Sequence, residues 1–232
     1  MNFKLIHAGL AALAVLAVPF TAQAADVPIK APYYKGAPRS VVSYYNWTGF
    51  YAGINGGYGF GTSDWSAPAV SPKPKGGMIG ATAGYNWQAG AIVYGVEGDI
   101  DYSMVKGSVA CGVGTCETRN DWLATFRGRI GYAFDRWLPY VTGGGAYGNI
   151  KATQTAGGAT ASASDSKFGY TFGAGLEYAF MGNWTAKLEY LYVDLGKATL
   201  GTAPATTDVS FKENIIRAGI NYKFSGPIFS RF

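Results

Sequence analysis

Charged residues recur at every second position in several stretches of the sequence, a spacing that places them on one face of a β-strand. Glu97, Asp99 and Asp101 form one such run, and Arg127 with Arg129 form another. Paired carboxylates can carry out general acid–base chemistry, but bases share this predicted face, which favours ion pairs instead. The complete set on this face is Glu97, Asp99, Asp101, Asp121, Arg127, Arg129, Glu177, Lys187, Glu189, Glu213, Arg217 and Lys223.

Two cysteines, Cys111 and Cys116, are separated by four residues. In an exported chain this spacing predicts a disulfide that closes a small loop. Metal binding by two thiols without a histidine is the weaker alternative, so we expect no metal site and no cofactor. The glycine-rich stretches 56–59 and 143–145 are not followed by the Gly-Lys-Ser/Thr of a phosphate-binding loop.

The first 24 residues have the pattern of a secretory signal peptide. A basic start is followed by an apolar segment over residues 8–20 and by the small-residue cleavage site Ala22-Gln23-Ala24. The apolar segment is shorter than the ~20 residues that a spanning helix needs. The single histidine, His7, lies in the predicted signal peptide, so the mature chain has no imidazole for a catalytic triad, which argues against an enzyme.

The composition favours a β protein. The chain of 232 residues contains 34 Gly, 16% aromatic and 14% charged residues. Glycine costs about 1 kcal/mol relative to alanine inside a helix, whereas aromatic residues are enriched in strands and scarce in disordered chains. The net charge is +5, but no run of Lys and Arg is dense enough to predict nucleic-acid binding.

Alternation predicts eight strands near residues 47–60, 76–88, 91–104, 119–134, 137–151, 167–181, 184–195 and 209–224. Short turns alternate with long loops over about 61–75, 105–118, 152–166 and 196–208. This rhythm is typical of an all-β, eight-stranded antiparallel up-and-down transmembrane β-barrel, with short periplasmic turns and long outer loops. We expect residues 1–24 to be the signal peptide, 25–46 a flexible periplasmic lead-in, 47–224 the barrel and 225–232 a tail.

The residue types on the two faces of each strand indicate which face contacts lipid and which lines the barrel interior. Large apolar rows oppose rows of glycine and charge, as Phe168, Tyr170 and Phe172 oppose Gly169 and Gly173. A soluble sheet also alternates, but the interior of an eight-stranded barrel is too narrow for such large rows. We therefore predict that the aromatic rows meet lipid and that the charges fill the interior as a salt-bridge plug. An ion-conducting path is the alternative.

The tryptophans support a membrane position. Trp47, Trp87, Trp137 and Trp184 lie beside short turns or the N-terminal entry, which predicts an aromatic girdle at the lipid–water boundary. Trp65 falls in the first long loop, where we expect it to be exposed. No stretch after residue 25 is apolar for ~18 residues, so we expect no spanning helix.

The end of the last predicted strand contains Arg217, Gly219, Tyr222 and Phe224, and the chain ends in Phe232. This pattern resembles the terminal-strand signal that the barrel assembly machinery reads. It leaves open whether Phe224 or Phe232 is the aromatic that is recognised.

Several blocks of the chain resemble a known family. They are Asn46-Trp47-Thr48-Gly49-Phe50-Tyr51-Ala52-Gly53, Gly84-Tyr85-Asn86-Trp87, Gly95-Val96-Glu97-Gly98-Asp99, Arg127-Gly128-Arg129-Ile130-Gly131-Tyr132, Leu138-Pro139-Tyr140-Val141-Thr142-Gly143-Gly144 and Lys187-Leu188-Glu189-Tyr190-Leu191-Tyr192-Val193-Asp194. They are similar to the small eight-stranded outer-membrane proteins of alphaproteobacteria, often called outer-membrane immunogenic or porin-family proteins. The resemblance covers residues 47–224 and implies an outer-membrane barrel, in a family whose relatives are described as immunogens, haemin binders or weak porins.

These observations lead to one expectation about function and three alternatives. We expect a monomeric, structural outer-membrane barrel that displays surface loops, with membrane lipid and the assembly machinery as its partners. A narrow channel, a binder of a surface ligand such as haemin, and a soluble lipocalin-like barrel are the alternatives. The sequence names no external ligand or host partner.

Overall fold

Residues 45–66, 69–112, 114–202 and 205–224 are described by a computed structural model, and they form one antiparallel sheet. The strands are β1 (Gly49–Ser66), β2 (Ala69–Val70), β3 (Lys75–Ala89), β4 (Ile92–Cys111), β5 (Gly114–Tyr132), β6 (Trp137–Ala156), β7 (Ala159–Met181), β8 (Trp184–Thr202) and β9 (Ala205–Lys223). The predicted signal peptide, most of the lead-in and the tail after residue 224 lie outside the described residues.

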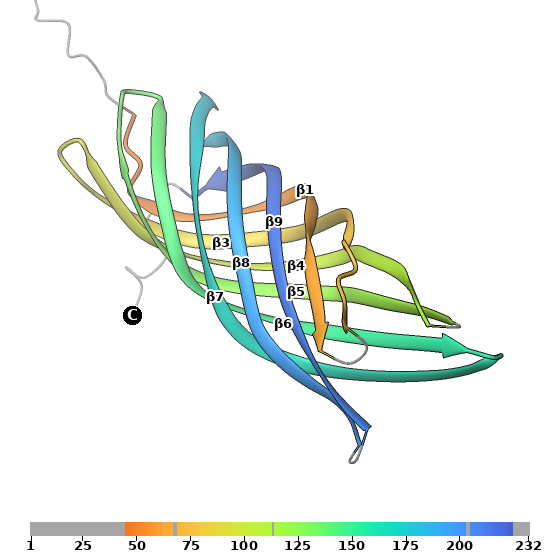
Figure 1. Ribbon diagram of the computed structural model, residues 1–232. Helices are drawn as coiled ribbons and strands as arrows, with labels where there is room; N and C mark the ends of the chain where they lie inside the picture. The colour runs from red at the N-terminus through yellow and green to blue at the C-terminus, as the bar shows by residue number, and fades with distance from the viewer. Residues whose placement is uncertain (1–44, 67–68, 113, 203–204, 225–232) are drawn as a thin grey trace, which may run out of the picture. The chain divides into compact units, whose positions relative to one another are not determined.

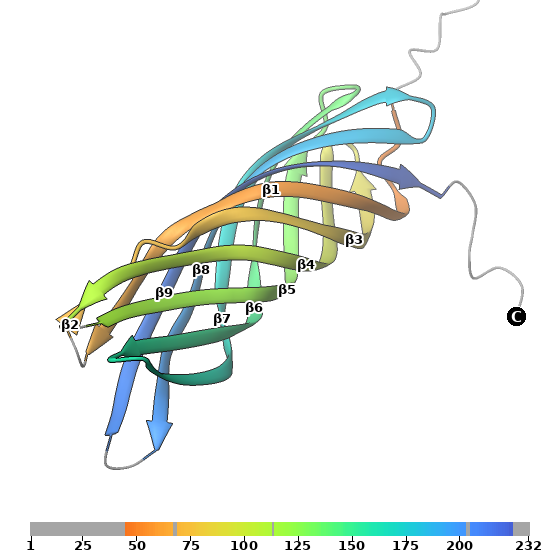
Figure 2. The same cartoon turned by 90° about the vertical axis from the view of Figure 1, so that its right-hand side faces the viewer.

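The sheet closes into a ring because β1 pairs with both β3 and β9. The closing register runs from Tyr51 opposite Lys223 to Trp65 opposite Val209. Each other long strand pairs with its sequence neighbours, while the two-residue β2 extends the outer end of β1 (Figures 1 and 2). The predicted fold class, an up-and-down antiparallel barrel, is confirmed.

The connections at one end are the short turns that the sequence predicts. Gly90, Asp135 and Gly182 occupy them with φ values of 62°, 53° and 52°. Positive φ is the conformation that tight hairpin turns require, and glycine adopts it without steric cost. In the topology of outer-membrane barrels this end faces the periplasm.

The predicted long loops at the opposite end are wrong in large part, because the strands continue through them as paired hairpins. β4 and β5 remain paired as far as Cys111 opposite Gly114, and β6 and β7 as far as Ala156 opposite Ala159. Apolar and polar residues do not alternate over the whole length of these segments, so the periodicity of the sequence does not identify them as strands. Gly112, Gly157 and Gly158, with φ values between 59° and 85°, mark the true turns.

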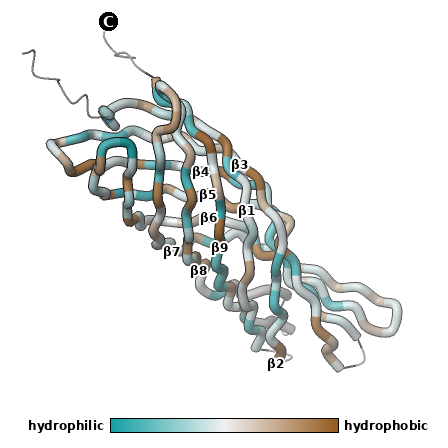
Figure 3. The backbone as a smooth tube through the Cα atoms, turned by 90° about the horizontal axis from the view of Figure 1, so that it is seen from above, coloured by the Kyte–Doolittle hydropathy of each residue, from teal (hydrophilic) through white to brown (hydrophobic). Residues whose placement is uncertain are grey.

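Aromatic and aliphatic side chains on the outside of the ring are exposed. Hydrophobic and hydrophilic residues follow one another along the strands (Figure 3). Phe126 and Phe168 are 68% and 75% exposed. Since the interior receives the opposite row, the predicted orientation of the aromatic rows is confirmed. Among the described residues, no helix is long and apolar enough to cross a membrane.

Candidate functional site

The inward face of the barrel carries a cluster of buried charges near the middle of the strands. β4, β5 and β8 each contribute more than one charged side chain, because successive inward positions are two residues apart. We call this cluster the charge network. Its members are Glu97, Asp99, Asp101, Arg127, Arg129, Glu177, Lys187, Glu189 and Arg217.

Arg127 of β5 lies at the centre of the charge network. Its guanidinium is 2.5 Å from Glu97, 2.6 Å from Asp99 and 2.9 Å from Glu189. The Arg127 side chain is fully buried, so these carboxylates satisfy it in place of water. Charge-assisted hydrogen bonds of this kind are about twice as strong as neutral ones.

Arg217 of β9 forms the second centre and shares three carboxylates with Arg127: those of Asp99 and Glu189 and, at 3.9 Å, that of Glu97. It is 2.9 Å from Asp99, 2.7 Å from Glu189 and 3.2 Å from Asp101. Strands that are distant in sequence are therefore tied together across the interior of the barrel. One carboxylate that bridges two guanidiniums also keeps both cations in fixed positions.

Arg129 extends the network toward the periplasmic end. It is 2.6 Å from Glu177 and 3.4 Å from Glu97, and its guanidinium lies 4.2 Å from the ring centre of Tyr140. Tyr51 donates a hydrogen bond of 2.8 Å to Glu97. Tyr51 and Tyr140 are not among the residues that the sequence predicts as partners of the charges. Both side chains nevertheless lie on the inward face that carries the charges.

Glycines make room for these rings. A Cβ atom at Gly84 would lie 2.5 Å from the hydroxyl of Tyr51, and one at Gly175 would lie 2.6 Å from that of Tyr140. Real Cβ atoms do not approach so closely, so the inward glycines allow bulky side chains to cross a narrow interior.

Three predicted members do not join the charge network. Asp121 is expected inside by simple alternation, but the register of β5 against β6 shifts between Arg119 and Leu123, and Asn120 is buried instead. Asp121 pairs with Arg119 toward the outer end. Lys223 donates to the carbonyl of Asn46 at the periplasmic rim. Glu213 is buried inside but takes part in none of the ion pairs of the described residues.

An apolar cluster fills the interior on the outer side of the charge network. We call it the outer core, and its fully buried members include Val105, Leu123, Ile150, Leu191, Val193, Val209, Phe211 and Ile215. The outer core also contains the disulfide that joins Cys111 to Cys116. At the level of the outer core the interior of the barrel is apolar, as the core of a soluble protein is.

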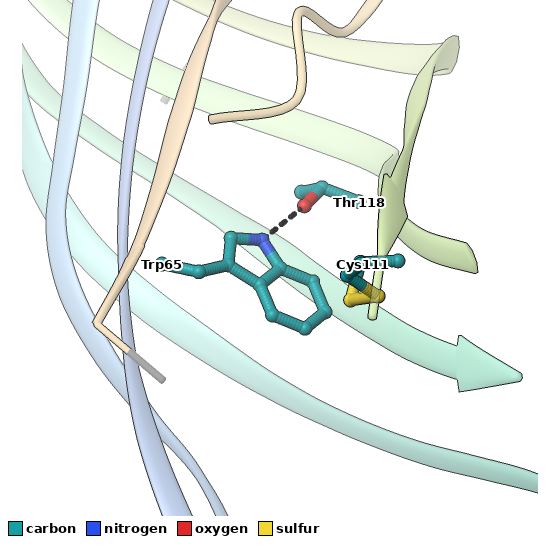
Figure 4. Close-up of a disulfide and its surroundings, with 4 residues drawn as sticks. Trp65, Cys111 and Thr118 are labelled. Atoms are coloured by element: carbon teal, nitrogen blue, oxygen red, sulfur yellow. Dashed lines mark hydrogen bonds between the residues drawn. A yellow bond between two sulfur atoms is a disulfide. The ribbon is translucent and has the colours of Figure 1, made fainter. Parts of the chain in front are cut away.

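Trp65 belongs to the outer core, so the expectation that it is exposed is wrong. β1 continues through residue 65, which keeps this side chain on the inward face, and it is 6% exposed. Its indole nitrogen donates a hydrogen bond of 2.8 Å to the hydroxyl of Thr118, beside Cys111 (Figure 4). A satisfied donor allows the large ring to be buried.

The periplasmic mouth contains a third layer. Trp47 is 1% exposed and packs with Val93, Leu138 and Ala179. Its expected place in the lipid-facing girdle is therefore wrong, because the chain before β1 turns the ring into the mouth, where its indole nitrogen donates to the carbonyl of Asp135 at 3.3 Å.

The other tryptophans beside the short turns lie on the outside. Trp87, Trp137 and Trp184 are 42%, 48% and 42% exposed. Each packs against a neighbouring tyrosine, as Trp137 does with Tyr178 at 4.3 Å between ring centres. These rings occupy the positions of an aromatic girdle at the periplasmic boundary.

Comparisons with known proteins agree with this architecture. The chain matches the outer membrane protein beta-barrel domain over residues 8–224. It is 38% identical to a 31 kDa outer-membrane immunogenic protein of Brucella melitensis, over 91% of this chain and 98% of that protein. It is 37% identical to a 22 kDa outer membrane protein of Rhizobium leguminosarum, over 77% of this chain and 79% of that protein.

Among solved structures, Neisserial surface protein A is 18% identical and has a TM-score of 0.42, over 76% of this chain and 98% of that chain. The family match covers all of the described residues, and the relatives are named as proteins of the outer membrane. The protein is therefore located in the outer membrane. The chain belongs to the family of outer membrane proteins that is defined by the beta-barrel domain.

Proposed function

We propose that this protein is a sealed, monomeric barrel with a structural role in the outer membrane, and that it is not an enzyme. A sealed barrel is one whose interior side chains leave no continuous path for water or ions. The observation that carries the proposal is the filling of the interior at three successive levels: the Trp47 layer, the charge network and the outer core.

The charge network supports a sealed interior over a conducting one. A conducting pore needs charged groups that face water, whereas the side chains of Arg127 and Asp99 are 0% exposed and those of Arg217 and Glu97 are 1% exposed. Ion pairs of 2.5 to 2.9 Å connect them without intervening water. The same pairing argues against acid–base catalysis, because these carboxylates are occupied by guanidinium groups.

The outer hairpins support a surface role. Beyond the outer core, β6 and β7 form a paired hairpin in which Thr160, Ser162 and Ser164 are exposed. Continuous backbone pairing holds this polar surface in place. We propose that the barrel stabilises the envelope and presents these hairpins outside the cell.

We also propose that the assembly machinery reads the outward aromatic residues at the end of β9. Tyr222 and Phe224 pack against each other with ring centres 5.2 Å apart, while Phe224 also lies 5.5 Å from Phe50 of β1. Arg217 and Gly219 are inward-facing, and Phe232 lies outside the described residues.

Planar-bilayer recording on the purified, refolded protein tests the sealed barrel. We expect no protein-dependent current steps from the wild type at neutral pH. The variant Arg217→Ala removes a cation from the charge network alone, so we expect the outer core and the Trp47 layer to keep it silent, as we expect of its outward neighbour Ile216→Ala, the matched control. Steady current steps from the wild type would refute the proposal in favour of a narrow channel.

A further inference from the structure

Glu213 is a buried carboxylate within the outer core. It is 0% exposed, and its neighbours at the inward positions of β9 are Phe211 and Ile215. Val193 lies opposite it on β8, and a Cβ atom at Gly59 of β1 would touch both its carboxylate and Val105. Neither carboxylate oxygen has a hydrogen-bond partner among the described residues.

Among the described residues of the strands around Glu213, no cation is free to pair with it. On β9, Arg217 is engaged with Asp99, Asp101 and Glu189, and Lys212 is half-exposed and directed toward Asp194 of β8. The β1 positions nearest to Glu213 are glycines.

The charged group that does act on Glu213 is Asp101 of β4. One oxygen of Asp101 is 3.2 Å from Arg217, but its other oxygen, Oδ1, has no hydrogen-bond partner in the described part of the chain. Two buried acids thus lie on the inward face, Asp101 in the charge network and Glu213 in the outer core. One is only partly satisfied, and the other is not satisfied at all.

The numbers of buried acidic and basic side chains also favour a protonated carboxylate. Within the described residues, the inward carboxylates that are at most 6% exposed are Glu97, Asp99, Asp101, Glu177, Glu189 and Glu213, and the inward cations that are at most 4% exposed are Arg127, Arg129, Lys187 and Arg217. The acids exceed the bases. An isolated buried carboxylate is costly enough that such a group takes up a proton rather than stay ionised.

We propose that Glu213, together with Asp101, forms a proton-binding site that keeps the outer core closed. The carboxylate of Glu213 takes one proton from water, forms an O–H bond and becomes a neutral acid; no other bond changes. Loss of this proton places an unpaired charge among Val105, Val193 and Phe211 and draws water into the outer core. The opening of the outer core at high pH rests on the proposed function, because it presupposes a barrel that is sealed at neutral pH. The binding of a proton by Glu213 does not depend on that function.

Unfolding in urea as a function of pH tests the proton site. The protein is refolded into phosphatidylcholine vesicles, and the wild type is compared with Glu213→Gln. If the folded state holds a proton that the unfolded glutamate has lost, the folding equilibrium constant of the wild type falls up to tenfold per pH unit above about pH 4.3, relative to the variant. The control Glu117→Gln, at a partly exposed glutamate of β5, should follow the wild type.

Parallel pH profiles for the wild type and Glu213→Gln would overturn the proposal. Infrared spectroscopy of the wild type gives a second measurement, since a buried neutral acid shows a carbonyl stretch that is absent from a carboxylate. We expect this band at neutral pH and expect Glu213→Gln to lack it. If the band is missing and stability depends on the concentration of Na⁺, K⁺ or Mg²⁺ instead, a bound cation replaces the proton and the proposal is wrong.

Bilayer recordings separate the two proposals. We expect the wild type and Glu213→Gln to be silent at neutral and at alkaline pH, because the charge network and the Trp47 layer still fill the barrel when water enters the outer core. Steps at neutral pH refute the sealed barrel and leave the stability profile as the measure of the proton site. Acrylamide quenching of tryptophan fluorescence reports on the outer core itself, because Trp65 belongs to it. We expect quenching of the wild type to rise at alkaline pH and that of Glu213→Gln to stay constant, and a wild type without this rise refutes the opening of the outer core.

Discussion

Replacement of Arg127 by leucine tests whether the interior of the barrel is dry. The guanidinium of Arg127 contacts Glu97, Asp99 and Glu189 at 2.5, 2.6 and 2.9 Å, and the side chain is fully buried. Removal of one partner from a buried ion pair costs about 3–5 kcal/mol, because the remaining charge is uncompensated. Since three carboxylates lose a partner here, we expect a loss at the upper end of this range, out of a total stability of roughly 5–15 kcal/mol.

The assay is equilibrium unfolding in urea of the protein refolded into phospholipid vesicles. Tryptophan fluorescence reports the transition, and the mobility of the unheated protein on a denaturing gel reports the folded fraction. Arg119→Leu is the matched control, since it removes an arginine from the same strand whose side chain is 44% exposed and pairs with Asp121. Exposed ion pairs contribute about 1 kcal/mol or less.

Equal effects of Arg127→Leu and Arg119→Leu would refute this reasoning. Such a result would mean that water solvates the carboxylates once Arg127 is gone, as it does at the surface. The interior would then be hydrated along its length, and the narrow channel would become the better account of the protein.

Four further changes give specific expectations. Replacement of both Cys111 and Cys116 by serine should lower the free energy of unfolding by about 2 kcal/mol, the value that the loop entropy predicts for a short closed loop, and urea titration measures it. Gly175→Ala should destabilise by about 1–3 kcal/mol, since its Cβ would overlap an inward tyrosine of β6. Gly128→Ala, whose Cβ would have its nearest neighbour at 3.9 Å, should be neutral or slightly stabilising in the same titration. Phe224→Ala should reduce the amount of protein recovered in the outer-membrane fraction, and an unchanged amount would contradict its role in assembly.

The membrane part of the fold could be predicted because two independent patterns agree there. Rows such as Phe168, Tyr170 and Phe172 alternate with glycine, and the turns carry glycine at the positions that need positive φ. The closing register between β1 and β9 could not be predicted in the same way. It depends on pairing between segments at opposite ends of the chain, for which local periodicity contains no information.

The interior could be predicted in composition but not in its local exceptions. Alternation identifies Glu97, Arg127 and Arg217 as inward residues. It places Asp121 inside as well, and one shift of register in β5 reverses that assignment, because a one-residue slip moves a side chain to the opposite face. The position of the Trp47 side chain differs from the prediction for another reason. Trp47 precedes β1, so the alternation of a strand does not determine which way this side chain points.

The polarity of the two faces reverses along the barrel axis, and this reversal connects the site to the membrane. On β8, Leu188 and Tyr190 face outward, whereas the next apolar residues, Leu191 and Val193, face inward. β9 makes the same change between Ile216, which is outward, and Ile215, which is inward. An apolar residue gains from burial wherever the alternative is water. It therefore lies outside where lipid surrounds the barrel and inside where water does. Inside the barrel this change separates the charge network from the outer core, and Glu213 lies just beyond it, on the side of the outer core. That position explains why its carboxylate meets the apolar side chains of the outer core instead of the cations of the charge network.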